Sequence, residues 1–529
     1  DHSLWDTERG NDRYLISNSS AVSDYAGAPG YGLSFNNNGF TVGANFNNQN
    51  VSGADYASWS FRKAPGFFTC VQYTGTGVNR TVDHDLASIP GMMIVKCTNT
   101  AGTNWLVYHR SLGATKAGIL DLTNTPVTSV GAWNNTAPTS TQFTVGVSND
   151  VNTDGDTYVA YLFAHDDQSF GTNGDESIIK CGSYTGNAST STGPTINLGF
   201  EPQWLMVKRT DNNDPGNSAY HSWIIQDNMR GLSAPPYGDP LGYQNLLFAN
   251  LTATEGKRGN GSGTANVQTQ FLITPTGFTV QSGATEFNDN GGTYIYMAIR
   301  RPNKPPTDAT EVFSATTYTG NATARDVGAT TNLCDLAIIG DRYVGSSSWS
   351  LYGQQFLTRL VNGITFASST TGAQTGGWDT YFDFDKMKGL FLGGVANYMN
   401  NAGTDFVLYN FKRAPGFFDV VTYLGTGSES ANSGQQNITH NLGVVPELIL
   451  VKIRDDVGDF TVYNAISGAA TNMRLNRINP DLADTYCWDN TTPTSSVFRV
   501  GAALNGNTNI VTKNYIAYLF ATLPGISKV

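Results

Sequence analysis

The residues with the clearest pattern for chemistry form a short acidic loop. Oxygen-bearing side chains alternate along it at Asp150, Asn152, Asp154 and Asp156, as in the first half of a D-x-[DN]-x-[DN]-G calcium loop. Alternate oxygens of this kind can converge on a hard cation such as Ca²⁺. The twelfth position of the loop is Tyr161 instead of a bidentate Glu. The competing interpretation is a polar hairpin turn, because Asn, Asp and Gly tolerate positive φ.

Two matched stretches place an aromatic ring beside amide side chains. Ala-Trp-Asn-Asn-Thr-Ala-Pro-Thr-Ser contains Trp133 and Asn135, and Cys-Trp-Asp-Asn-Thr-Thr-Pro-Thr-Ser contains Trp488 and Asn490. An indole can stack on a sugar ring while amides bind its hydroxyl groups. These four residues are therefore candidate glycan contacts. The alternative is packing at the base of a loop, since the stretch recurs at two places in the chain.

Motifs for catalysis are missing from the sequence. It has no G-x-S-x-G elbow, no G-x-x-x-x-G-K-[ST] loop and no H-E-x-x-H motif. His84 and His440 share one repeated slot, which Ile196 fills elsewhere. A slot that accepts an apolar side chain favours a structural histidine over a ligand or a base. We therefore predict no catalytic residues and a chain that is not an enzyme.

A repeating unit must position these candidates. Phe61-Arg-Lys-Ala-Pro-Gly-Phe-Phe68 returns as Phe411-Lys-Arg-Ala-Pro-Gly-Phe-Phe418, and each copy is followed by Tyr-x-Gly-Thr-Gly. Weaker echoes indicate a period of roughly 100 residues, which is too long for a solenoid turn, so the repeating object is a whole domain. The short Ala-Pro-Gly-Phe-Phe joint predicts stiffly connected neighbours, because Pro restricts φ and the two Phe side chains can be buried between them.

A complete module carries five signals in a fixed order. They are a Tyr-x-Gly strand end, a Pro followed by an apolar strand ending in Lys, an aromatic strand start, a strand close to Phe-Thr-Val-Gly, and a closing strand. The second module shows them at Tyr73, Pro90 to Lys96, Trp105, Phe143 to Gly146 and Tyr158 to Ala164. Such β-branched and aromatic runs, bounded by Gly, Asn, Pro and Asp, are typical of strands. We predict an all-β chain of tandem antiparallel β-sandwich modules, jelly-roll or lectin-like.

The signals divide the chain into five modules. The predicted boundaries are an incomplete first module at 1–68, a second at 69–171, a third at 172–306, a divergent fourth at 307–418 and a fifth at 419–529. The first module lacks its opening strands, so we expect residues upstream of Asp1. The fourth is divergent because Leu336-Ala-Ile-Ile339 stands where the Pro-to-Lys strand belongs.

Composition excludes several classes of protein. Charged residues make up 14% of the chain and the net charge is −11, which argues against nucleic acid binding through a basic face. No apolar run approaches the ~20 residues that span a bilayer, so membrane insertion is not expected. Polar, uncharged surfaces suit extracellular β-proteins, and the five cysteines are expected to be buried free thiols.

Several strings point to a family resemblance. They include Trp105-Leu-Val-Tyr-His-Arg-Ser-Leu-Gly113, Pro138-Thr-Ser-Thr-Gln-Phe-Thr-Val-Gly146 and Gly199-Phe-Glu-Pro-Gln-Trp-Leu-Met-Val-Lys-Arg209. They resemble repeats of large structural proteins of tailed phages, particularly marine phages, that form tail fibres or virion appendages. The resemblance covers nearly the whole chain. It implies a β-sandwich module in a virion fibre that contacts the host surface.

Three functions are compatible with the sequence. The leading expectation is a non-enzymatic structural component of a virion fibre or appendage, at the extracellular virion surface, assembled with copies of itself and other virion proteins. The first alternative is a glycan-binding adhesin, a lectin-like receptor-binding protein for host surface glycans, which predicts exposed Trp or Tyr beside amides. A lesser alternative is a polysaccharide-degrading, tailspike-like enzyme, which requires a pair of carboxyl groups at a fixed separation.

Overall fold

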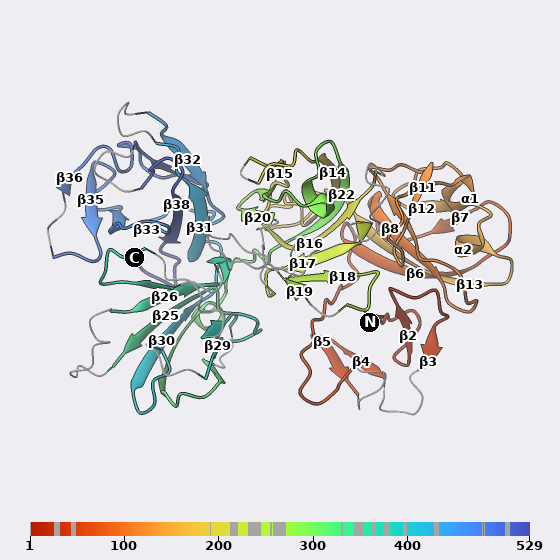
Figure 1. Ribbon diagram of the computed structural model, residues 1–529, viewed down its shortest axis with the longest axis horizontal. Helices are drawn as coiled ribbons and strands as arrows, with labels where there is room; N and C mark the ends of the chain where they lie inside the picture. Colours follow the sequence, from red (N-terminus) through yellow and green to blue (C-terminus); the bar gives the residue numbers. More distant parts are fainter. Residues whose placement is uncertain are drawn as a thin grey trace. The chain divides into compact units, whose positions relative to one another are not determined.

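The protein is described by a computed structural model (Figure 1). The structure describes residues 2–25, 32–43, 49–190, 192–211, 221–230, 245–253, 256–257, 271–328, 332–342, 353–361, 365–373, 381–394, 399–427, 433–478, 480, 482–502 and 508–529. Two compact units are present. Unit 1 comprises Asp1–Gln226, Leu246–Arg258 and Val280–Arg301, and unit 2 comprises Asp227–Asn245, Gly259–Thr279 and Pro302–Val529.

The chain is built almost entirely of antiparallel β-sheets, which confirms the predicted all-β sandwich class. The described helices are short, and three of them are α-helical turns: α1 (Val130–Trp133), α2 (Asn149–Asn152) and α3 (Thr285–Asn288). Two 3₁₀ turns, η2 (Ala309–Glu311) and η4 (Arg359–Val361), lie in unit 2. The strands follow the sequence signals because runs of β-branched and aromatic residues can be buried in a sheet, and β8 is buried at every position.

The second module shows the architecture most completely. Its main sheet has the order β11-β10-β9-β8-β13-β6, and β12 pairs with β7 in a smaller sheet. The strands are β6 (Phe68–Thr74), β7 (Arg80–Asp83), β8 (Pro90–Cys97), β9 (Leu106–His109), β10 (Lys116–Ile119), β11 (Val127–Thr128), β12 (Gln142–Val145) and β13 (Thr157–Ala164). The closing strand β13 is central because it pairs with both β6 and β8.

The two sheets of this module enclose an aromatic core. The Tyr73 ring stacks on Tyr158 with centroids 5.2 Å apart and meets Phe143 of the small sheet at 6.0 Å. All three side chains are buried. The same pair closes the other modules, as Tyr184 on Tyr294, Tyr318 on Phe406 and Tyr423 on Tyr515. The Tyr-x-Gly signal is therefore a core position opposite the closing strand.

The first and third modules contribute the remaining strands up to Arg300. In the first, β1 (Ser3–Leu4), β2 (Arg13–Ile16) and β3 (Asp24–Tyr25) form one sheet, and β4 (Leu33–Asn36) pairs with β5 (Gly39–Val42). The third module repeats the main sheet as β14-β22-β16-β17-β18-β19. Its strands are β14 (Ile179–Thr185), β15 (Thr195–Asn197), β16 (Pro202–Arg209), β17 (Ile224–Asp227), β18 (Asn245–Phe248), β19 (Gly256–Lys257), β20 (Phe271–Thr274), β21 (Gly277–Val280) and β22 (Thr293–Arg300).

Unit 2 contains the fourth and fifth modules. The sheets of the fourth have the orders β23-β30-β25-β26-β27 and β24-β29-β28. Its strands are β23 (Phe313–Thr319), β24 (Arg325–Val327), β25 (Leu336–Asp341), β26 (Gln355–Thr358), β27 (Thr365–Ala367), β28 (Phe382–Asp383), β29 (Leu390–Leu392) and β30 (Asp405–Phe411). Leu336-Ala-Ile-Ile339 thus lies in β25, which pairs with the closing strand β30 as β8 pairs with β13.

The fifth module returns to the arrangement of the second. Its sheets have the orders β31-β38-β33-β34-β35-β36 and β32-β37. The strands are β31 (Phe418–Leu424), β32 (Gln436–Thr439), β33 (Leu448–Ile453), β34 (Phe460–Asn464), β35 (Thr471–Arg474), β36 (Leu482–Ala483), β37 (Val497–Val500) and β38 (Asn514–Phe520). The exact module boundaries stay a prediction.

Candidate functional site

The two tryptophans predicted to touch glycans lie inside the protein. Trp133 and Trp488 are 0% and 1% exposed, and their rings meet Tyr108 and Tyr463 edge-on. A buried indole cannot stack on a sugar, so the glycan-contact prediction is wrong for these two rings. The competing interpretation, packing at the base of a loop, describes them. Each ring fills the core beneath a loop because the surrounding side chains are apolar.

The amide partners of these tryptophans lie on the surface. Asn135 and Asn490 are exposed and have φ values of 52° and 45°. Each follows another left-handed residue, Asn134 at 47° or Asp489 at 48°. Asn and Asp tolerate this conformation better than most residues. The matched sequence stretches therefore encode a tight turn above a buried ring, and the structure separates the amide from the aromatic face.

The predicted calcium loop does not gather its oxygen atoms. Residues 149–152 form α2, where the Asp150 Oδ1 accepts the Asn104 N–H at 2.6 Å. The Asp156 Oδ1 accepts the Thr100 hydroxyl at 2.7 Å, and Asp154 is exposed. Within the described ranges, no group of three or more His, Cys, Asp or Glu side chains could hold a metal ion. Calcium binding stays a prediction that this geometry does not favour.

Asn152, the remaining candidate ligand of that loop, has a structural role instead. Its side chain is fully buried, donates to the carbonyls of Val78 and Gly146, and accepts the Thr76 N–H at 2.9 Å. Asn288, Asn400 and Asn509 take the same position in the other complete modules, and each accepts a main-chain N–H just after the Tyr-x-Gly motif. Each satisfies buried backbone groups that would otherwise lack partners.

The sequence contained a signal for this asparagine that its interpretation missed. In all four modules the asparagine stands six residues before the aromatic residue that opens the core of the closing strand, as Asn152 does before Tyr158. The Gly of Tyr-x-Gly packs against the same segment of main chain as this asparagine. A Cβ on Gly75 would lie 2.1 Å from the Thr153 carbonyl oxygen, and Gly186, Gly320 and Gly425 are equally close to main chain.

The lysine that ends the Pro-to-Lys strand joins successive modules. Lys96, Lys208 and Lys452 are 0% exposed. Each ammonium group donates to a carbonyl of the preceding module, to Ser20 at 3.5 Å, Thr123 at 3.1 Å and Thr371 at 3.1 Å respectively. Each also donates to a carbonyl of its own module, to Thr103, His221 and Gly458. The lysine thus bridges two modules through main-chain oxygens.

The aromatic strand start lies beside that lysine and also crosses the boundary. The Trp105 Nε1 donates to the carbonyls of Ile16 and Ser19 at 3.2 and 3.0 Å, and the Trp223 Nε1 donates to Ile119 at 2.8 Å. In the fifth module Phe460 has no such donor and packs its ring 5.5 Å from Phe356 of the fourth. We call each lysine with its aromatic neighbour a junction clamp.

Burial alters the electrostatics of the clamps. Removal from water lowers the pKa of Lys208 to about 7 and that of Lys452 to about 8, and it also lowers the pKa of Lys96. The charged form is disfavoured because the carbonyl partners replace water only in part. In the fourth module Gly340 takes this place, opposite Val407. Trp349, the aromatic residue of the fourth module that corresponds in sequence to Trp105, lies outside the described residues.

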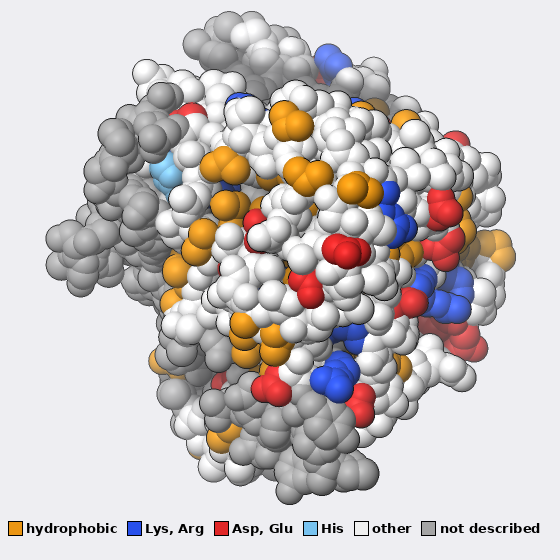
Figure 2. Space-filling view, turned by 90° about the vertical axis from the view of Figure 1, so that its right-hand side faces the viewer, with side chains coloured by type: hydrophobic (Ala, Val, Ile, Leu, Met, Phe, Trp, Pro, Cys, Tyr) orange, Lys and Arg blue, Asp and Glu red, His pale blue; other side chains and the backbone are white. Residues whose placement is uncertain are grey.

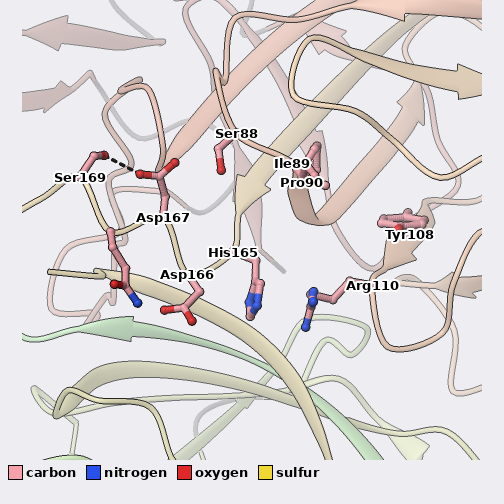
Figure 3. A pocket seen from close by; sticks show the side chains of 10 residues that line it. Ser88, Ile89, Pro90, Tyr108, Arg110, His165, Asp166, Asp167 and Ser169 are labelled. Carbon is pink, nitrogen blue, oxygen red and sulfur yellow. Dashed lines mark hydrogen bonds between the residues drawn. The ribbon is translucent and has the colours of Figure 1, made fainter. Parts of the chain in front are cut away.

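A pocket of about 590 Å³ lies next to the junction of the second and third modules (Figure 3). Three segments line it: Ser88, Ile89 and Pro90 at the start of β8; Tyr108 and Arg110 at the end of β9; and His165 to Ser169 after β13. Figure 3 shows Arg110 and His165 next to each other, with Asp166 on the other side of His165. No sequence motif indicated this site, because its residues are far apart in the chain.

The groups of this pocket have distinct partners. The His165 Nδ1 accepts the Cys181 N–H at 3.1 Å, and the Asp166 carboxylate pairs with Lys180 at 3.1 Å. Burial and the neighbouring Arg110 charge lower the pKa of His165 to about 4, so its ring is neutral at pH 7. Ser169 donates its hydroxyl to Asp167 at 2.5 Å.

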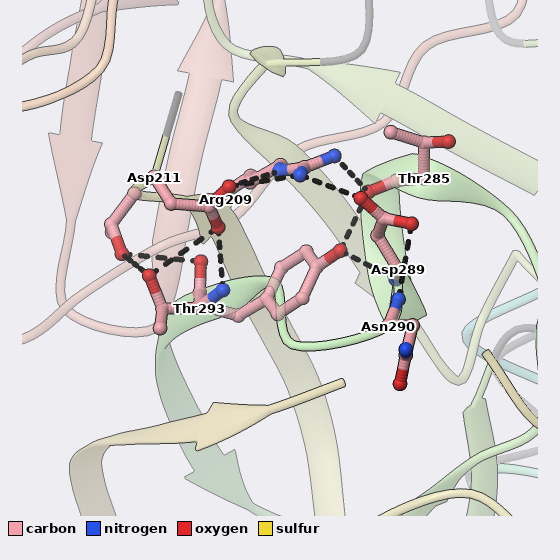
Figure 4. Close-up of polar contacts among 8 residues, drawn as sticks. Arg209, Asp211, Thr285, Asp289, Asn290 and Thr293 are labelled. Carbon is pink, nitrogen blue, oxygen red and sulfur yellow. Dashed lines mark hydrogen bonds and ion pairs between the residues drawn. The ribbon is translucent and has the colours of Figure 1, made fainter. Parts of the chain in front are cut away.

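A separate polar cluster closes the end of β16. Figure 4 shows Arg209 between Asp211 and Asp289, with ion pairs of 2.8 and 2.7 Å. The guanidinium is fully buried. Burial acts to lower the pKa of Arg209, but the two carboxylates outweigh it and raise the pKa. Asp211 also accepts the Thr293 N–H, so the cluster ties β16 to β22 and has no group left for chemistry.

His84 and His440 make the contacts of structural histidines, which is the role that their shared sequence position favours. The Nδ1 of His84 and of His440 accepts the N–H two residues later, of Leu86 and Leu442, at 3.3 Å. Their rings stack on Phe143 and Phe498. Burial lowers the pKa of both rings.

The described surface carries few charges. On the face drawn in Figure 2, Lys and Arg side chains are interspersed with Asp and Glu, and neither kind forms a continuous patch. Among the residues that the structure describes, no helix has the length and apolar character that crossing a membrane would require.

Comparison with known proteins adds a family but no activity. A family model described as a domain of unknown function, DUF7483, matches residues 1–302 and 418–529. The unmatched stretch is almost the same as the module that the sequence sets apart as divergent. No curated protein was found to match the chain.

Proposed function

We propose that this chain, which belongs to the DUF7483 family, is a structural component of a virion fibre or appendage. In this role its β-sandwich modules act as stiffly joined building blocks at or near the host-contacting surface. The support comes from the repeat itself, from the resemblance of its strings to phage appendage proteins, and from a polar surface with few charges.

The observation that carries the proposal is the repeated junction clamp. Separating two modules would break the bond from a fully buried lysine to a carbonyl of the preceding module, as between Lys208 and Thr123. It would also break the indole bond of Trp223 to Ile119. Each lost hydrogen bond that leaves a buried group unsatisfied costs about 1–3 kcal/mol. A chain whose modules must transmit force or keep spacing benefits from such joints.

The Phe-Phe joints reinforce the clamps. Phe61 packs against Phe68 at 5.6 Å and against Trp204 of the third module at 6.2 Å. The equivalent Phe411 packs against Phe417 and Phe418 in unit 2. Aromatic contacts of this kind add to the area that a bent joint would expose. Stiff joints of repeated modules extend a fibre without adding a new fold.

The native mass of the chain in solution tests this proposal. Size exclusion coupled to light scattering on the 56.8 kDa chain is expected to give a trimer or a larger assembly, because fibres of this type are built from several chains. A monomer at all accessible concentrations would sink the self-assembling fibre. A monomer would instead favour a decoration protein or a free lectin.

Glycan binding remains a second candidate, and one observation favours it. The tryptophans named for it are buried, but the pocket of Figure 3 offers polar side chains beside an apolar wall.

A further inference from the structure

Two hydrogen-bond donors in the pocket have no partner among the residues that the structure describes. The Arg110 side chain is exposed, and its guanidinium makes no hydrogen bond or ion pair with any residue that the structure describes. The His165 Nδ1 is occupied by the Cys181 N–H, so the proton of the neutral ring is on Nε2. No described residue accepts from Nε2. The two groups lie next to each other (Figure 3).

The rest of the lining suits hydroxyl groups and a ring. Ser88, Gln168 and the carboxylates of Asp166 and Asp167 can donate to or accept from hydroxyls. Ile89, which is 59% exposed, and its neighbour Pro90 supply an apolar wall. A few placed polar groups beside apolar side chains in a pocket of this size are typical of small-ligand sites.

The module junction holds the pocket in shape. A Cβ on Gly91, next to Pro90 in β8, would lie 2.6 Å from the His165 Cβ and 2.9 Å from the Cys181 Sγ. Cys181 of the third module therefore packs directly against Gly91 in β8, and its N–H binds the His165 ring beside it. Since Lys208 and Trp223 fix the same two modules and the Cys181 N–H binds the His165 ring, His165 is already ordered when a ligand binds, whereas the exposed Arg110 side chain loses conformational freedom on binding.

We propose that this pocket binds the carboxylate-bearing sugar of an acidic saccharide, with the carboxylate held by Arg110 and the Nε2–H of His165. A guanidinium can bind a carboxylate through two parallel hydrogen bonds. A neutral sugar would leave these donors unused. A dianionic phosphate would be repelled more strongly than a carboxylate by Asp166 and Asp167. The inference deepens the proposed function, because it names the ligand class for a host-contacting surface.

The test uses a matched pair of probes on the full chain. Calorimetric titration with oligogalacturonate and with its methyl ester compares the same sugars with and without the carboxylate charge. Sialyllactose and lactose form a second pair. We expect measurable binding of at least one acidic probe and at least tenfold weaker binding of its neutral counterpart, since a hydrogen bond to a charged group contributes about 1.5–3 kcal/mol.

Variants assign the binding to the pocket. Arg110→Gln is expected to weaken binding of the acidic probe about tenfold to a hundredfold, and Arg110→Lys to weaken it less. Arg342→Gln, the same change at an exposed arginine in unit 2, is the control and should bind as the parent does. The unfolding midpoint of Arg110→Gln should not change, because the guanidinium makes no hydrogen bond or ion pair within the described ranges of the chain.

Several results would overturn the inference. They are equal affinity for the acidic and neutral probes, unchanged affinity in Arg110→Gln, displacement of the probe by equimolar inorganic phosphate or sulfate, or no binding of any probe at millimolar concentration. None of these results depends on the native mass, so the inference and the proposed function can fail separately.

Discussion

Replacing Lys208 by Met tests the junction clamp through the pH dependence of stability. The lysine is fully buried between the second and third modules, and burial lowers its pKa from 10.5 to about 7. Above pH 7 the folded chain therefore binds fewer protons at this site than the unfolded chain. The free energy of unfolding must then rise with pH from about 7 towards the unfolded-state pKa near 10.5.

The size of the effect follows from the shift. Where only the unfolded lysine is protonated, each pH unit adds about 1.4 kcal/mol to the free energy of unfolding. Because the folded lysine is about half protonated at pH 7, the gain between pH 7 and 9 is on the order of 2 kcal/mol. Lys208→Met removes the titrating group and keeps the length of the stem, so this part of the rise should disappear.

Urea unfolding followed by tryptophan fluorescence at pH 7, 8 and 9 measures the difference between the two proteins. Groups common to both, including Lys96, cancel in the comparison. Lys116→Met, at an exposed lysine of β10, is the control and should keep the slope of the parent. Parallel profiles for the parent and Lys208→Met would refute the reasoning. The reasoning would also be refuted if the free energy of unfolding of the parent did not change between pH 7 and 9, because that would mean that water reaches Lys208.

Three further predictions concern the packing that repeats between modules. Gly75→Ala places a Cβ 2.1 Å from the Thr153 carbonyl oxygen and should lower the free energy of unfolding, measured by urea titration, by about 1–3 kcal/mol. The control is Gly131→Ala, whose added Cβ lies 3.5 Å from the nearest atom, and which should change the free energy of unfolding by less than about 1 kcal/mol. Trp223→Phe removes the bond to Ile119 and should cost about 1–3 kcal/mol in the same assay; an unchanged midpoint would contradict the clamp. All five cysteines are buried and free, so the native chain should not react with Ellman's reagent at pH 8, while five thiols per chain should react after denaturation; fast reaction of the native chain would show that these thiols are reachable.

Sequence patterns identified the strands because buried strands are rich in β-branched and aromatic residues and are bounded by Gly, Asn, Pro and Asp. The Tyr-x-Gly ends, the Pro-to-Lys strand and the closing strand were all located in this way, and the divergence of the fourth module was visible in the same pattern. The pattern could not say which polar residues face inward. Asn152 looked like a metal ligand because its oxygen alternates with those of Asp150 and Asp154. In the structure its side-chain amide instead forms hydrogen bonds with one main-chain N–H and two main-chain carbonyls.

The same limit explains the tryptophans. A Trp followed by Asn and Thr has the same sequence pattern whether its indole faces a sugar or the core. Only the tertiary fold shows that Trp133 and Trp488 are buried. The recurrence of the stretch in two modules was the sequence evidence for the core, since matched loops recur where packing recurs.

Residue types and their spacing were enough to predict the class of fold, the order of the five signal segments in a module and the repetition of that module, because these depend on local properties of the chain. The tertiary structure alone decided what the repeated lysine and tryptophan bind and which distant residues meet in the pocket. Lys208 and Trp223 bind main-chain carbonyls, and a carbonyl is present at every residue and leaves no mark in the sequence. Arg110 and His165 become neighbours only when β9 and the end of β13 are brought together.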